Sequence, residues 1–175
     1  FGLLYGSGAT GLRNYAGAMG VTMSMDEAKK IREDWLGAYP GIAAWQRERA
    51  SDADKPLRNG SSAEIRIPVS GFRRFLPGDM NRLTVRANSP IQGAGAAVLK
   101  VALGNLWPLV QKAGPNEVRI SAAVHDEILC LVREEHAEKW RDLLKSTMEK
   151  AEAMWLGDVP ALAEAKIGET WSETH

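Results

Sequence analysis

The sequence contains very little cysteine and histidine. Cys130 is its single cysteine among 175 residues, and there are three histidines. One cysteine cannot form a disulfide within the chain, which fits a reducing, cytoplasmic compartment. One cysteine and three scattered histidines are also too few for a zinc site built from those side chains. We therefore expect Cys130 to pack as a small apolar side chain rather than to react.

Long apolar runs and a charged leader are missing as well. No apolar run approaches the ~20 residues that cross a membrane, so we expect no membrane partner. The chain opens on Phe1-Gly-Leu-Leu-Tyr-Gly6, without the basic start of a signal peptide. Because this opening is typical of the middle of an element, we expect a fragment of a longer polypeptide.

Two common catalytic patterns are absent too. Gly6, Gly8 and Gly11 are not followed by Lys and Ser or Thr, so they do not form a phosphate-binding loop of the P-loop type. Ser121 falls on a predicted strand and His125 follows directly at its end, an arrangement that does not favour a nucleophile triad. The sequence therefore favours neither nucleotide binding of the P-loop kind nor serine chemistry.

The net charge of zero hides two oppositely charged segments. Residues 55–86 carry seven basic and two acidic side chains, a net charge of +5. Residues 126–175 carry twelve acidic and six basic side chains, a net charge of −6. A basic segment on a neutral chain indicates contact with a polyanion, although a solvated arginine-rich loop explains the charge equally well.

The elements predicted from periodicity and turn residues mix helices with short strands. Ser24-Met-Asp-Glu27 has the pattern of a capping box and starts a helix that ends at Tyr39-Pro-Gly41. Ser89 and Pro90 are a candidate N-cap and first residue for a long helix whose apolar side chains cover most of its circumference, so we expect it to be buried. The predicted helices lie at 12–19, 24–39, 42–53, 82–113 and 135–155, with a helix end at 1–5, and the predicted strands lie within 56–79, at 118–124, at 128–132 and at 162–167.

Three consecutive polar residues separate the two central strands. Val118–Val124 and Ile128–Val132 are rich in β-branched residues, and His125, Asp126 and Glu127 lie between them. An antiparallel hairpin would hold Asp126 at its bend. Turns favour aspartate for conformational reasons, and a carboxylate held at such a bend also suits metal binding or acid–base chemistry. Both interpretations stay open on these residues alone.

Two further pairs of residues are spaced four apart. Asn88 and Gln92 share a helix face if both are helical, and their amides can donate to the minor-groove acceptors that every correct base pair presents. A helix cap and a surface glutamine are the simpler explanation. Phe1 and Tyr5 are suited to stack on a base, although core packing is the simpler explanation on these residues alone.

Taken together, these stretches resemble the C-terminal part of the family A DNA polymerases, the DNA polymerase I type. Phe1-Gly-Leu-Leu-Tyr-Gly6 resembles the end of motif B, and Asn88-Ser-Pro-Ile-Gln-Gly93 resembles the palm segment before a long helix. Val124-His-Asp-Glu127 resembles motif C, and Gly168-Glu-Thr-Trp171 resembles the family's closing residues. The resemblance implies an α+β fold in which residues 1–54 form a helical fingers portion and residues 55–175 form a palm portion with a small antiparallel sheet packed on helices.

The resemblance also implies roles for individual residues. Asp126 would bind one or both Mg²⁺ ions of a two-metal site with the ions about 4 Å apart, and Glu127 would support it. His125 would contact the primer backbone, and Phe1 and Tyr5 would lie beside the incoming nucleotide. The remaining implied contacts are with the DNA duplex and involve Asn88, Gln92, Arg73, Arg74 and Arg86.

Two departures from the family pattern matter. Thr84 stands where the family usually has an arginine, four residues before Asn88. Motif A, with the second catalytic aspartate, has no counterpart in these 175 residues, so the Mg²⁺ site would be completed by a carboxylate outside the chain. We expect the chain to act with primer–template DNA, a deoxynucleoside triphosphate and the N-terminal part of the polymerase, and not to polymerise alone. The alternative is a non-catalytic DNA-binding module of the same shape.

Overall fold

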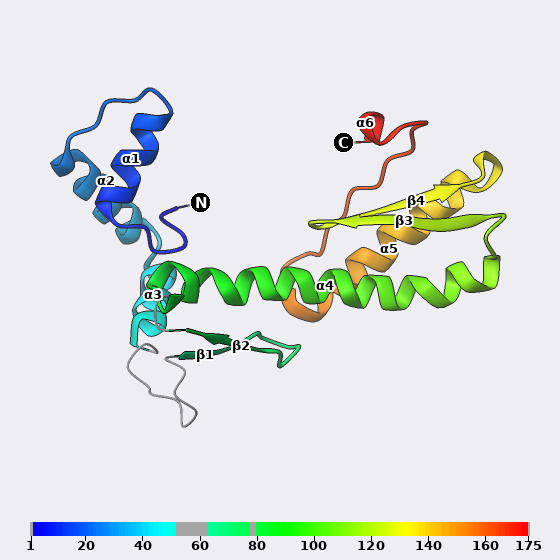
Figure 1. Ribbon diagram of the computed structural model, residues 1–175, viewed down its shortest axis with the longest axis horizontal. Coiled ribbons are helices and arrows are strands. Elements are labelled where there is room, and N and C mark those ends of the chain that lie inside the picture. The colour runs from blue at the N-terminus through cyan, green and yellow to red at the C-terminus, as the bar shows by residue number, and fades with distance from the viewer. Residues whose placement is uncertain (1, 52–62, 78–79, 175) are drawn as a thin grey trace. The chain divides into compact units, whose positions relative to one another are not determined.

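The computed structural model describes residues 2–51, 63–77 and 80–174, and it confirms the expected α+β class (Figure 1). The strands in these ranges form two separate antiparallel hairpins rather than one small sheet. The elements are α1 (Ala9–Ala18), α2 (Met25–Ala38), α3 (Pro40–Ser51), β1 (Ala63–Arg66), β2 (Arg73–Leu76), α4 (Leu83–Ala113), β3 (Val118–Val124), β4 (Glu127–Val132), η3 (Glu134–His136), α5 (Ala137–Leu156) and α6 (Trp171–Thr174).

The chain forms two compact units. Unit 1 comprises residues 1–67 and 71–91, and unit 2 comprises residues 68–70 and 92–175. The boundary near residue 54 was expected for polymerase subdomains, and it stays a prediction.

In unit 1, α2 begins where the sequence predicts. The Ser24 hydroxyl accepts a hydrogen bond from the Glu27 backbone N–H at 3.2 Å, and Glu27 Oε2 accepts from the Ser24 backbone N–H at 2.8 Å. These two bonds satisfy donors that would otherwise lack partners at the helix start. They also lower the pKa of Glu27, mainly through the backbone bond from Ser24.

The segment before α1 is a series of turns, so the predicted helix end at 1–5 is wrong for its described residues. Gly6 N–H donates to Leu3 O at 3.1 Å, and Ser7 N–H donates to Gly2 O at 3.0 Å. Gly6 has a φ of +84°, which a glycine adopts at little cost and which ends any helical repeat.

Unit 2 is built around a single apolar cluster. α4 contributes Ala102, Leu106 and Val110, the β3–β4 hairpin contributes Val118 and Ile128, and α5 contributes Trp140 and Ala151. The half-buried Cys130 packs against this cluster, and burial raises the pKa of its thiol. The expected packing role of Cys130 is therefore confirmed. Residues of α4 and α5 pack against the β3–β4 hairpin in this cluster.

Helix α4 closely matches the predicted range 82–113, but it is less buried than expected. It begins at Leu83, so Ser89 and Pro90 lie inside it and do not cap it. Its apolar side chains Ile91, Trp107 and Leu109 are exposed, whereas Ala102, Leu106 and Val110 are buried in the core of unit 2. By length and composition alone, α4 is also long and apolar enough to cross a membrane. The expectation from the sequence considered only uninterrupted apolar runs, and the apolar stretch of α4 is interrupted by polar residues. Core helices of globular domains meet the same criterion, and α4 contributes to such a core.

Residues 162–167 do not form the predicted last strand. Alanine, glutamate and lysine, which make up four of these six residues, have low strand propensity. The only pairing that β4 makes within the described residues is with β3.

Replacing Ser24 by Ala should lower the stability of α2 by about 1 kcal/mol, because the backbone N–H of Glu27 loses its acceptor. Amide hydrogen exchange along α2 measures this change. Ser24→Asp is the matched control, since aspartate is an equally good N-cap, and equal exchange in the Ala and Asp variants would contradict the capping role.

The stability of unit 2 should fall in acid partly through Glu117. Its pKa is lowered, first by the hydrogen bond from Lys139 Nζ at 2.7 Å and then by that from the Trp140 indole at 2.8 Å. A carboxyl group with a lowered folded-state pKa stabilises the fold above its unfolded pKa of about 4.3, and this contribution is lost as pH falls through the folded pKa. The loss of thermal stability between pH 7 and pH 3 should be smaller in Glu117→Gln than in the exposed control Glu33→Gln.

Candidate active site

The turn between β3 and β4 has two residues, His125 and Asp126. Val124 pairs with Glu127 across the hairpin, so the loop is as short as hairpin loops become. His125 has a φ of +53°, and Asp126 does not have a positive φ. Positive φ at the first loop position alone is the pattern of a type II′ turn, where glycine is usual. The fold therefore holds a non-glycine residue in a strained conformation beside Asp126, as is common at functional sites.

A β-bulge lies in the strand that leads to this turn. Ile120 pairs with Cys130 and Ala122 pairs with Leu129, so Ser121 is an extra residue in β3. Ser121, Asp126 and Glu127 all line a groove of about 660 Å³ whose other lining residues come from the rest of β4, from α5 and from the stretch 162–174. Bulges often lie beside active sites because they redirect neighbouring side chains.

The Asp126 side chain is exposed and makes no hydrogen bond or ion pair with the part of the chain that the structure describes. An unengaged carboxylate is a suitable ligand for a hard cation such as Mg²⁺. In residues 2–51, 63–77 and 80–174, no three His, Cys, Asp or Glu side chains converge on one point. The described residues alone therefore do not form a site of three or more such ligands at Asp126.

The neighbours of Asp126 differ from each other. His125 is exposed, and Glu127 is half-buried. Glu127 Oε2 accepts a hydrogen bond from the indole N–H of Trp171 at 3.3 Å. Trp171 was recognised in the sequence only as part of a terminal motif, and nothing in its spacing indicated this contact.

Asn88 and Gln92 both lie on α4, four residues apart, as their predicted shared face requires. Gln92 is exposed, and Asn88 is half-buried. Asn88 Oδ1 is buried and has no hydrogen-bond partner within the described ranges. Asn88 does not cap a helix, because α4 begins five residues before it.

The arginines of the basic segment have different environments. Arg73 lies over the ring of Phe75 at 5.6 Å, and Arg74 Nη1 donates to Ser89 Oγ at 3.1 Å. Arg86 is 5% exposed, and its guanidinium donates to Arg49 O at 2.8 Å and to Asn81 O at 3.0 Å. Arg74 and Arg86 therefore use their charged side chains for hydrogen bonds within unit 1.

Tyr5 lies half-buried in the turns before α1, whereas Phe1 is outside the described residues. The buried Gln46 of α3 supports this segment, because its Nε2 donates to Leu3 O at 2.7 Å and to Leu4 O at 3.0 Å. Gln46 was missed in the sequence, since a lone polar residue in a helix gives no periodic signal.

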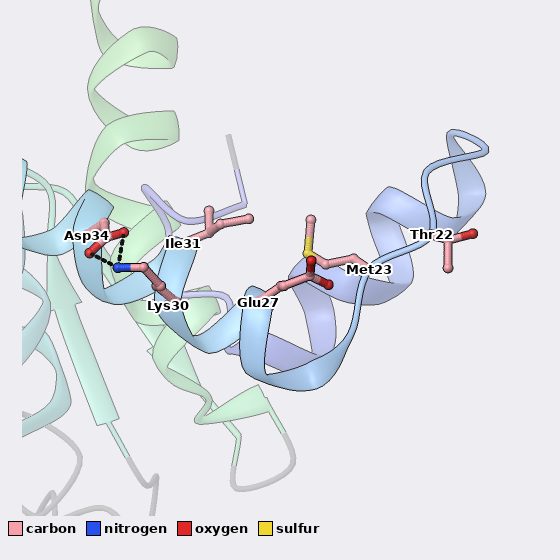
Figure 2. A pocket seen from close by; sticks show the side chains of 6 residues that line it. All are labelled: Thr22, Met23, Glu27, Lys30, Ile31 and Asp34. Atoms are coloured by element: carbon pink, nitrogen blue, oxygen red, sulfur yellow. Dashed lines mark hydrogen bonds and ion pairs between the residues drawn. The ribbon is translucent and has the colours of Figure 1, made fainter.

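A second hollow lies on α2 and is shallow, at about 220 Å³ (Figure 2). Its charged residues already have partners: Lys30 pairs with Asp34 at 3.1 Å, and Glu27 belongs to the capping box. It offers no unengaged reactive group, so the turn at Asp126 is the better candidate site.

The sequence of this chain matches the family model described as DNA polymerase family A over residues 1–173. The chain belongs to DNA polymerase family A. It is 32% identical over 174 residues to DNA polymerase I of Aquifex aeolicus (strain VF5), covering 99% of this chain and 29% of that protein. It is 33% identical over 176 residues to DNA polymerase I of Lactococcus lactis subsp. cremoris (strain MG1363), covering 99% of this chain and 19% of that protein. This family A chain thus spans less than a third of the length of these relatives.

The conformation of His125 can be tested by substitution. His125→Gly should keep or increase the stability of the β3–β4 hairpin, because glycine adopts positive φ without strain. His125→Val should destabilise it by about 1–3 kcal/mol relative to Gly, because a β-branched residue resists this conformation. Amide exchange of β3 and β4 measures the difference, and equal protection in both variants would rule out the positive φ.

Proposed function

We propose that this chain forms one part of the active site of a DNA-directed DNA polymerase, which adds nucleotides to a primer 3′-hydroxyl by a two-metal mechanism. The single observation that carries the proposal is the unengaged Asp126 carboxylate at the tip of a rigid two-residue turn, in a chain that matches family A throughout. The names of the relatives support the reaction class.

Asp126 has the central role in this proposal. Its carboxylate would hold Mg²⁺, which when bound lowers the pKa of the attacking hydroxyl and neutralises charge on the leaving pyrophosphate. The short hairpin limits the movement of the carboxylate, so that ligand geometry is prepared before substrate binds. Glu127 would support the turn, and His125, exposed beside it, would contact the primer backbone.

The remaining residues would bind DNA and nucleotide. Asn88 and Gln92 would donate to the minor-groove acceptors of the base pair at the primer end, which tests pairing geometry without reading sequence. Tyr5, and Phe1 with it, would lie beside the incoming nucleotide. Arg73 would contact the phosphate backbone, because its side chain is half exposed, although phosphate would have to compete with its ion pair to Glu64 Oε1 at 3.7 Å.

The duplex role of Arg74 and Arg86 has less support. Arg74 already donates to Ser89, and Arg86 would have to exchange its bonds to Arg49 and Asn81 for phosphate. Because motif A, with the second catalytic aspartate, has no counterpart in these 175 residues, we expect no primer extension by the 175 residues alone.

The test is single-nucleotide primer extension by the complete enzyme in which this chain functions. Asp126→Asn should lower kcat by about 10²–10³-fold, because the metal loses a charged ligand. Affinity for primer–template duplex should change little, since the substitution removes no cationic contact to phosphate.

The matched control is Asp158→Asn, an exposed aspartate that follows α5 and does not line the groove, which should keep full activity. If Asp126→Asn extends primers as well as the control, Asp126 is not a metal ligand. If no variant or wild-type enzyme extends primers while duplex binding persists without any Mg²⁺ effect, the chain is a DNA-binding module instead.

A further inference from the structure

The residues before and within α6 form a closed turn around one carboxylate. Glu169 N–H donates to Glu173 Oε2 at 2.8 Å, and Thr170 Oγ1 donates to Glu173 Oε1 at 3.0 Å. These bonds lower the pKa of Glu173, with the backbone bond from Glu169 as the largest cause. Both oxygens of Glu173 are therefore held by the residues that lead into the helix.

Gly168 allows this turn to close. A Cβ added at Gly168 would lie 2.9 Å from Glu173 Cβ and 3.0 Å from Thr174 Cγ2. Such distances are shorter than carbon atoms tolerate, and the neighbouring carbons belong to short, constrained parts of their side chains. The stretch Gly168–Thr174 is thus a compact piece in which Gly168, Thr170 and Glu173 each have a defined structural role, and we call it the terminal clasp.

The terminal clasp presents Trp171 to the turn beside Asp126. The indole N–H of Trp171, which can only donate, lies 3.3 Å from Glu127 Oε2. Glu127 follows Asp126 directly, and Trp171, Glu127 and Asp126 line the same groove. Trp171 remains 50% exposed, so burial of its ring alone does not explain its position.

We infer that Trp171 is a positioning residue for the Asp126 turn and acts through Glu127. This inference rests on the proposed function, since it gives the hydrogen bond a purpose in catalysis. By holding the Glu127 carboxylate at one place, Trp171 limits the motions of the first residue of β4 and keeps this second carboxylate from competing for the position of Asp126. Partners of this kind beyond the metal ligands typically change metal affinity or activity by about 10–100-fold.

The contact itself can be tested on the 175-residue chain without any activity. Each of the six tryptophans gives one indole N–H signal in a ¹⁵N-labelled sample. Glu127→Ala should shift the Trp171 signal and speed its exchange with water. The signals of Trp140 and Trp155 should stay in place, because they donate to Glu117 and to Pro68 O instead.

Two further variants distinguish loss of the Glu127–Trp171 contact from a general effect of removing a glutamate or of unfolding. Glu164→Ala, which removes an exposed glutamate from the same part of the chain, should leave the Trp171 signal unchanged. If Glu127→Ala disturbs all the indole signals, the isosteric Glu127→Gln replaces it and should still shift the signal of Trp171. A Trp171 signal that responds to neither substitution at Glu127 would overturn the inference.

Catalytic positioning is then measured in the complete enzyme. Trp171→Phe keeps an aromatic ring but removes the donor, so kcat should fall about tenfold while KM for the nucleotide and affinity for duplex stay the same. Adding Trp171→Phe to Glu127→Ala should cause no further loss, because both changes remove one interaction. An unchanged kcat in Trp171→Phe, or fully additive losses, would refute positioning through Glu127.

Failure of this inference differs from failure of the proposed function. If Asp126→Asn slows extension as expected and Trp171→Phe does not slow it, only the role of Trp171 is wrong. If Asp126→Asn extends primers normally, the proposed function is wrong, and the positioning role is lost with it.

Discussion

The packing of the β3–β4 hairpin onto α4 and α5 is the constraint on which the candidate site depends. Val118 and Ile128 are buried in the same cluster as Leu106 and Trp140, which fixes both strands of the hairpin from beneath. An isolated two-stranded hairpin is marginally stable in water, so these contacts are what make the turn rigid. Asp126 can be exposed and still well placed because its position is set by apolar residues that it never touches.

The same dependence on the core explains why the exposed Asp126 lies only a few residues from buried apolar side chains. Burial of a carboxylate without a partner is costly, so a free acidic side chain has to stand in water at the end of a buried element. A two-residue loop makes that transition over the shortest possible length, at the expense of a strained backbone at His125. The packed core of unit 2 stabilises the strained conformation of His125. A fixed turn of this kind keeps the Asp126 carboxylate in one position before a ligand binds.

Local rules in the sequence predicted some of this structure well. The Ser24–Glu27 capping box, the hairpin around Asp126 and the helical spacing of Asn88 and Gln92 follow from contacts within a few residues, and each was found. The strand expected at 162–167 and the helix start expected at Ser89 did not appear. A strand needs a partner that periodicity cannot supply, and a proline inside a long helix is tolerated when the surrounding contacts are strong enough.

Long-range polar contacts mark the limit of what the sequence reveals. Gln46 supports the turns near Tyr5 across 43 positions of sequence, Arg86 supports Arg49 O across 37, and Trp171 reaches Glu127 across 44. Glutamine and arginine are ordinary surface residue types, so composition counts Arg86 within the basic segment although its guanidinium is engaged inside unit 1. Charge along a sequence therefore overstates the charge available to a ligand, because it cannot distinguish an arginine that faces phosphate from one that binds a backbone carbonyl.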